Sequence, residues 1–169
     1  MTDSSQIQVR LLKAADAPLF REIRLEALQR SPEAFGSTFE HERTQSLAQF
    51  EEVLTKADVF GAFNGADLVG MAGYRTQAGA KQAHKGLLWG MYVGPVARGS
   101  GAAQRLVEAV LRHARERVEL VQLVVVSENE VARRLYRRCG FVEYGHEVHS
   151  LKQNGRYYDQ ILMAVALSD

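Results

Sequence analysis

The sequence contains few of the residues that usually restrain a small or secreted protein. It has one cysteine, Cys139, and only three prolines among 169 residues. A single cysteine cannot form an internal disulfide, which excludes a disulfide-stabilised scaffold and favours a reducing compartment. A chain of this length can bury a full apolar core without such restraints. We therefore expect one domain over residues 1–169 and, by default, a cytoplasmic protein.

Long apolar runs and an excess of one charge are absent as well. No apolar stretch approaches the roughly 20 residues needed to cross a bilayer, and residues 1–10 lack the apolar segment of a signal peptide. The 21 basic and 20 acidic side chains leave a net charge of +1. Binding to nucleic acid normally needs a basic face, and the arginines of residues 133–138 also fit a solvated helix face. We expect no membrane and no nucleic-acid partner.

The hydrophobic pattern predicts strands alternating with helices. Strand patterns cover residues 7–13, 59–63, 68–74, 87–93, 120–126, 141–151 and 157–167. Helical patterns cover about 16–28, 45–56, 106–114 and 127–139, the last opened by a capping box of Ser127 and Glu130. Asn64-Gly65 and Asn154-Gly155 predict hairpin turns. The fold expected is α/β of the α+β kind: a mixed, mostly antiparallel central sheet with helices on both faces and one right-handed parallel crossover over residues 87–126.

A run of small residues, Arg98-Gly99-Ser100-Gly101-Ala102-Ala103, joins a predicted strand to a predicted helix. Such a turn leaves backbone N–H groups unpaired and pointing the same way, and the helix dipole adds partial positive charge. Arg98 and Arg105 add full charges, and no acidic side chain lies between Trp89 and Val107. The run predicts a site for a phosphate or pyrophosphate. The alternative is a glycine-rich loop that only turns the chain.

Simple nucleotide-binding motifs do not fit this run. No Gly-Lys-Ser/Thr follows it, as a P-loop requires, and Gln104 stands where the dinucleotide fingerprint needs its third glycine.

A second segment runs from Asn129 to Tyr136 as Asn-Glu-Val-Ala-Arg-Arg-Leu-Tyr and is followed by Gly140-Phe141. At helical spacing Tyr136 shares a face with Ala132. Its phenol can donate a proton to a departing thiolate, although a lone tyrosine is more often a core residue. Asn129 is equally compatible with a plain helix cap.

Taken together, the two segments resemble the GNAT superfamily of N-acetyltransferases. The hallmark of that superfamily, Arg/Gln-x-x-Gly-x-Gly/Ala after a strand, is matched by Arg98, Gly101 and Ala103. Residues 91–95 resemble the strand end before that loop, and residues 129–141 resemble the second motif.

The resemblance implies acetyl-CoA as the acetyl donor. The amides of residues 99–103 would hold its pyrophosphate, and the backbone of residues 91–93 would pair with the pantetheine arm where two parallel strands splay apart. Tyr136 would protonate the leaving thiolate. The residues assigned to the cofactor in this way are Met91, Tyr92, Val93, Arg98, Gly99, Ser100, Gly101, Ala102, Ala103, Asn129 and Tyr136.

The acceptor and the catalytic base are less well defined. The resemblance implies direct attack by a primary amine of a small molecule or peptide in a ternary complex, and because dimers are common in the superfamily a homodimer is one option. Residues 87–91 carry no carboxylate to act as base, so Glu33, with Glu26 as the other choice, is the candidate. The alternative function is a non-catalytic acyl-CoA-binding or sensing module.

No metal is expected, because His146 and His149, three apart in a predicted strand, should face opposite sides.

Overall fold

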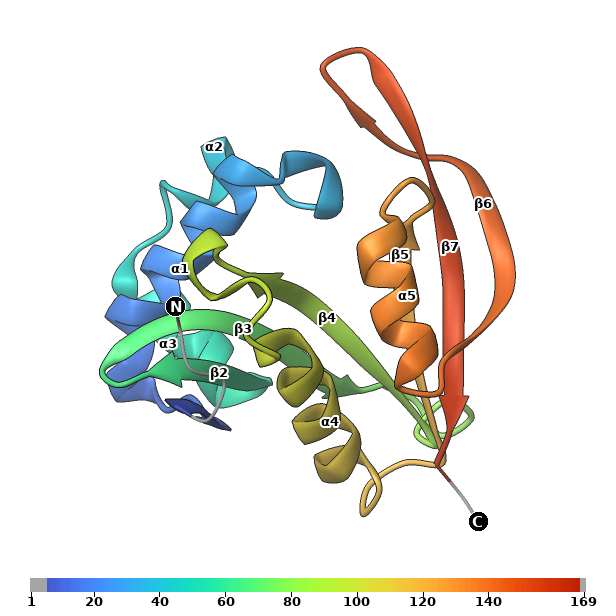
Figure 1. Cartoon of the computed structure of the whole chain (residues 1–169), viewed down its shortest axis with the longest axis horizontal. Helices are drawn as coiled ribbons and strands as arrows, with labels where there is room; N and C mark the ends of the chain where they lie inside the picture. The colour runs from blue at the N-terminus through green and yellow to red at the C-terminus, as the bar shows by residue number, and fades with distance from the viewer. Residues whose placement is uncertain (1–5, 168–169) are drawn as a thin grey trace.

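The computed structural model describes residues 6–167 as one seven-stranded sheet in the order β1-β2-β3-β4-β5-β7-β6, shown in Figure 1. The strands are β1 Ile7–Leu11, β2 Asp58–Asn64, β3 Asp67–Thr76, β4 Lys85–Val93, β5 Leu120–Val126, β6 Val142–Gln153 and β7 Arg156–Ala166. The helices are α1 Ala17–Arg30, α2 Phe39–Glu42, α3 Leu47–Lys56, α4 Ala102–Ala114 and α5 Glu130–Arg138, with short 3-10 turns η2 Ala14–Asp16, η3 Pro32–Ala34 and η4 Pro95–Ala97. The predicted fold class is confirmed, while α2 and the 3-10 turns were not predicted.

The parallel crossover of the prediction is β4-α4-β5. The two strands pair only at Lys85–Leu120, Gly86–Val121 and Leu87–Gln122 within residues 6–167. Beyond that end they diverge, as Figure 1 shows. All other strand pairs are antiparallel. The β5-facing edge of β4 is therefore left without a partner strand from residue 88 onward.

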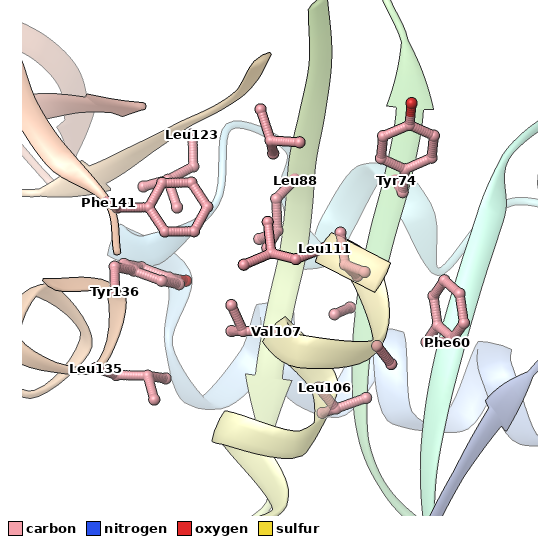
Figure 2. Close-up of a cluster of buried hydrophobic side chains, with 14 of the residues drawn as sticks. Phe60, Tyr74, Leu88, Leu106, Val107, Leu111, Leu123, Leu135, Tyr136 and Phe141 are labelled. Atoms are coloured by element: carbon pink, nitrogen blue, oxygen red, sulfur yellow. The ribbon is translucent and has the colours of Figure 1, made fainter. Parts of the chain in front are cut away.

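Helices cover the sheet from both sides. On one face α4 and α5 pack through Leu106, Val107 and Leu135 in the cluster of Figure 2. On the other face α1 and α3 meet through Phe20 and Phe50, whose ring centroids are 6.0 Å apart in an edge-to-face contact. The alternation of side chains along the strands sends successive residues to these two cores. No helix of the described residues is long and apolar enough to span a membrane.

A β-bulge interrupts β4 at Gly90. Met71 and Gly73 of β3 pair with Tyr92 and Trp89, so β4 holds one more residue than β3 between the two pairs. Gly90 takes up the extra residue with φ +65°, a conformation that glycine adopts without strain. Trp89 and Tyr92 consequently face the same core, against α1 and α3.

Two details of the predicted turns and caps differ from the structure. Asn64 pairs with Asp67, so the turn residues of the first hairpin lie one position later than predicted, whereas the turn at Asn154-Gly155 is confirmed by the Gln153–Arg156 pair. The predicted capping box at the start of α5 is wrong. Asn129 is the N-cap there, because its side chain accepts the Ala132 N–H.

A largely buried carboxylate just after β1 makes acid stability testable. Both terminal guanidinium nitrogens of Arg10 donate to Asp16 at 2.8 and 2.9 Å, and the Lys13 N–H donates at 2.7 Å. The Arg10 hydrogen bonds, more than the Lys13 contact, lower the pKa of Asp16 to about 2. Because this pKa is below the unfolded value, the resulting stability is present above about pH 4 and is lost as the pH falls through about 2.

We expect Asp16→Asn to lower the free energy of unfolding at pH 7 by about 1–2 kcal/mol, a figure reduced because Arg10 is half exposed. Urea titrations of both proteins from pH 7 to pH 3 should show the difference shrinking below about pH 4. A difference that stays constant over this range would show that ionisation of Asp16 does not stabilise the fold.

Candidate active site

The loop of residues 98–103 turns from η4 into α4 through two glycines of positive φ. Gly99 has φ +80° and Gly101, the N-cap of α4, has φ +85°. A Cβ placed on either glycine would have no atom within 4 Å. The loop therefore presents backbone, rather than side chains, to open space at the start of a helix of 13 residues.

The N–H groups of this loop fall into two sets. Ser100 donates its N–H to Ala97 O at 3.2 Å, and the Ala102 N–H donates to Ser100 Oγ at 3.3 Å. Within residues 6–167 no acceptor is found for the N–H groups of Gly99, Gly101, Ala103 and Gln104. Free amides at a helix N-terminus, where the dipole adds positive charge, suit a bound phosphate or pyrophosphate.

Of the two arginines expected to add charge at the loop, only Arg98 stays there. Its Nε donates to Val93 O at 3.3 Å, and its side chain is exposed. Arg105 instead donates to the Ile7 carbonyl of β1. Ser100 is 5 % exposed and its hydroxyl donates to Ala97 O, so this side chain shapes the loop from inside.

The open edge of β4 ends next to this loop at Val93. Gly94 donates its N–H to Val69 O of β3 at 2.8 Å. Strand alternation therefore points the N–H and C=O of Val93 the other way, toward the gap that separates β4 from β5. Since the Val93 C=O accepts from Arg98, its N–H is the group left for a ligand. Met91, two residues before Val93, packs its side chain against the core on the α4 face.

Tyr92 is oriented differently from its two neighbours. Its backbone pairs with Met71 of β3, and its hydroxyl donates to Glu26 Oε2 of α1 at 2.7 Å. Burial, reinforced by this hydrogen bond, raises the pKa of Tyr92 to about 12. Its side chain thus lies on the face opposite α4 and α5.

Asn129 and Tyr136 both belong to α5, the first as its N-cap and the second as a buried residue. Asn129 Oδ1 accepts the Ala132 N–H at 3.2 Å, which confirms the capping role and leaves the side-chain NH₂ of Asn129 without a hydrogen bond inside the described chain. Tyr136 is 5 % exposed and packs edge-to-face on Phe141 at 5.8 Å. Figure 2 shows its hydroxyl pointing from α5 toward the side of α4 that carries Val107.

The Tyr136 hydroxyl makes no hydrogen bond to residues 6–167, yet it is not fully enclosed. The one completely buried side-chain polar atom without a partner in that range is Trp89 Nε1. Burial raises the pKa of Tyr136 far above its usual value, with a smaller contribution from Cys139. The hydroxyl is therefore protonated at neutral pH and has a free hydrogen-bonding position.

Comparison with known proteins identifies the family. The model of the "Acetyltransferase (GNAT) family" matches residues 21–141. The chain belongs to the GNAT family, whose members are acetyl-CoA-dependent N-acetyltransferases.

Solved GNAT structures share the fold over nearly the whole chain. The GNAT-family acetyltransferase of Streptococcus pneumoniae superposes with a TM-score of 0.86 at 18% identity, covering 95% of this chain and 99% of that one. The yncA structure from Salmonella typhimurium, solved with its cofactor acetyl-CoA, gives 0.83 at 20% identity, covering 97% and 95%.

One relative, whose name states its acceptor, matches a shorter segment of this chain. The spermidine N(1)-acetyltransferase of Vibrio cholerae is 36% identical over 78 residues, 45% of each chain, so the match spans less than half of that relative.

The two candidate bases of this GNAT chain lie in different surroundings. Glu33 is half-buried in η3, which contacts β5 and β6, and no hydrogen bond to the described residues ties up its carboxylate. Glu26, by contrast, accepts from Tyr92. The assignment of the base to Glu33 or Glu26 stays a prediction.

The regular alternation of side chains that predicted opposite orientations for His146 and His149 does not hold in this part of β6, where His149 has φ +52°. The register is irregular between Glu147 and Leu151, and Asp159 accepts both from His146 Nε2 and from the His149 N–H, each at 2.8 Å. No cluster of three or more His, Cys, Asp or Glu able to hold a metal occurs in residues 6–167.

Sequence reasoning missed an ion pair between α1 and α2. Arg24 Nε and Nη2 donate to the two carboxylate oxygens of Glu42 at 2.9 Å each, and both side chains are largely buried. Burial opposes ionisation of Glu42, but hydrogen bonds from Arg24 and Ser37 outweigh it and keep the pKa of Glu42 below its usual range. A signal was present: Arg24 lies four residues after Phe20, on the apolar stripe of its helix.

Proposed function

We propose that this GNAT chain transfers an acetyl group from acetyl-CoA to a primary amine of a small molecule or peptide. The observation that carries the proposal is the set of free amides at the start of α4, open to solvent and next to the unpaired edge of β4. Every helix leaves its first amides unpaired. Here two glycines of positive φ also keep side chains away from them, so an anion can approach the backbone.

The proposal revises the set of amides that the sequence predicted to bind the pyrophosphate. Because the N–H groups of Ser100 and Ala102 are already used inside the loop, we assign the pyrophosphate to the free amides. These are the amides of Gly99, Gly101, Ala103 and Gln104, the last of which the sequence motif did not indicate. The pantetheine arm would follow the open edge of β4 and accept from the Val93 N–H, with the Asn129 side chain beside it.

The chemistry proposed is direct attack. The amine nitrogen attacks the thioester carbonyl, the C–N bond forms, the C–S bond breaks, and CoA leaves as a thiolate while the amine loses a proton. Holding both reactants in attack geometry supplies much of the rate. Tyr136, protonated and with a free hydroxyl, donates a hydrogen bond to the departing sulfur. Glu33, acting through water, is the base we propose for the amine proton.

The alternative is a protein that binds acyl-CoA without turning it over. The absence of a carboxylate on residues 87–91 of β4 is its support, whereas the free Tyr136 hydroxyl opposes it, because a sensing module does not need a hydrogen-bond donor at the sulfur. A panel of amines that includes spermidine, amino acids and short peptides separates the two. Release of free CoA thiol with any amine supports the enzyme, and acetyl-CoA binding without release across the panel supports the sensor.

Two glycines of similar backbone conformation test the pyrophosphate site. Gly101 and Gly79 both have positive φ, +85° and +95°, and a Cβ added to either would meet no atom within 4 Å. We expect Gly101→Val to weaken acetyl-CoA binding by at least about tenfold, because the side chain occupies the phosphate position. Gly79→Val, on the loop between β3 and β4, carries the same kind of backbone strain and should leave the Kd unchanged in calorimetry. Equal Kd values for the two variants would place the pyrophosphate elsewhere.

A further inference from the structure

The guanidinium of Arg24 is held in place by several contacts on the face of the sheet that α1 covers. Its Nε and Nη2 bind Glu42 at 2.9 Å, and its centre lies 5.2 Å from the centroid of the Phe35 ring. Only 12 % of the side chain is exposed. Three separate segments therefore fix the position of this group: α1, α2 and the connection between η3 and α2.

The third nitrogen of this guanidinium, Nη1, is not used by the protein. No acceptor in residues 6–167 receives a hydrogen bond from it. It is also absent from the fully enclosed unpartnered atoms, a set that holds only Trp89 Nε1 over the same range. Nη1 therefore reaches accessible space with two N–H donors available.

The position of Nη1 is next to the β4 bulge. A Cβ on Gly90 would lie 3.7 Å from Nη1, which is the nearest group to it. Gly90 lies in the middle of the open edge of β4, where β4 and β5 have separated. Arg24 reaches it from the face covered by α1, while Tyr136 belongs to the core on the opposite face. With acetyl-CoA in the gap and Tyr136 acting at its sulfur, as proposed above, Nη1 lies on the opposite face of the sheet, which leaves that face for the amine.

The chemistry of this nitrogen selects its partner. A guanidinium donates only, and its strongest partners are carboxylate and phosphate oxygens. An ammonium group has no acceptor to offer this nitrogen. We propose that Arg24 binds a carboxylate oxygen of the acceptor, so that the preferred acceptors are amines that carry a carboxylate, such as amino acids, rather than polyamines. This proposal rests on the proposed acetyl transfer.

Matched acceptors test the proposal on the full chain. The set consists of phenylalanine, phenylalaninamide and phenethylamine, with spermidine as the polycationic comparison. We expect kcat/KM for phenylalanine to exceed that for each of the others by at least about tenfold, since an unpaired donor in the site penalises acceptors without the oxygen. Comparable values across the set would overturn the proposal while leaving acetyl transfer intact. No transfer to any amine would overturn the proposed function itself, and this proposal with it.

Two variants test whether Arg24 causes the preference for phenylalanine. In Arg24→Lys we expect the preference for phenylalanine to fall to within about threefold, through KM rather than kcat, because lysine keeps the charge but not the forked donors. The Kd of acetyl-CoA should stay unchanged. Glu42→Gln keeps the shape of the partner and removes its charge, so it should increase the preference. If Arg24→Lys does not fold, Glu42→Gln decides alone, and an unchanged or smaller preference in that variant contradicts the proposal.

Discussion

Tyr136→Phe is expected to lower kcat for acetyl transfer by about 100-fold while changing the Kd of acetyl-CoA by less than about twofold. The ring of Tyr136 is a core group packed on Phe141, and phenylalanine preserves that packing. The lost hydroxyl, by contrast, makes no hydrogen bond to residues 6–167. The change therefore removes the proposed donor to the leaving sulfur and little that stabilises the fold.

Tyr74→Phe is the matched control for this prediction. Tyr74 lies in the same core at 1 % exposure, and its hydroxyl contacts Thr76 Oγ1 at 3.0 Å. Loss of that hydroxyl should leave kcat unchanged. Steady-state and single-turnover rates of both variants provide the measurement, since only the single-turnover rate isolates the chemical step. A single-turnover rate of Tyr136→Phe equal to that of the wild type would remove Tyr136 from the leaving-group role.

The pH profile adds an independent check on the same residue. Because burial raises the pKa of Tyr136 well above its usual value, the hydroxyl remains protonated through the whole neutral range. Deprotonation of this group should therefore cause no loss of kcat below about pH 10. A fall of kcat near neutral pH that disappears in Tyr136→Phe would contradict the raised pKa of Tyr136.

Glu42→Ala is expected to lower the free energy of unfolding by about 3–5 kcal/mol, the typical cost of leaving one member of a buried ion pair uncompensated. Glu42 and Arg24 have side-chain exposures of only 11 % and 12 % and meet through two hydrogen bonds. Alanine removes both of these bonds and leaves the guanidinium buried without its counter-charge. Urea unfolding monitored by circular dichroism gives the difference directly.

The paired substitution separates charge from packing. The double variant Arg24→Met with Glu42→Leu removes both charges and fills similar volume, so it should recover most of the stability lost in Glu42→Ala. A single-variant loss below about 1 kcal/mol would mean that solvent reaches the pair freely, as it does at exposed salt bridges.

The sequence predicted the fold well where one local signal determines each element. The apolar run Leu120–Val126 is β5 without any shift of its ends, and Asn154-Gly155 forms the turn of its hairpin because both residues tolerate positive φ. The bulge in β4 was not predicted, although Gly90 inside a strand pattern is a known signal for one. The bulge makes Trp89 and Tyr92 face the same core. That effect depends on how β4 pairs with β3, and the sequence pattern of one strand does not show this pairing.

The candidate site was predicted only in part, for a similar reason. The loop of residues 98–103 is visible from its composition, but which of its amides are free depends on the Ser100 hydroxyl turning inward. The pairing of Arg24 with Glu42 depends on how α2 packs on α1, and the two residues are 18 positions apart. The proposed pyrophosphate loop is thus encoded in adjacent residues, whereas the proposed carboxylate site at Arg24 is assembled by tertiary contacts.

Amide chemical shifts in ¹⁵N-labelled protein titrated with acetyl-CoA test the central claim most directly. Binding in the gap between β4 and β5 should shift the free amides of α4 and its loop, together with Val93 on the β4 edge, while Gly79 stays in place. The α4 and loop amides are those of Gly99, Gly101, Ala103 and Gln104. Shifts confined to other elements, or no shifts at saturating acetyl-CoA, would contradict the proposed donor site.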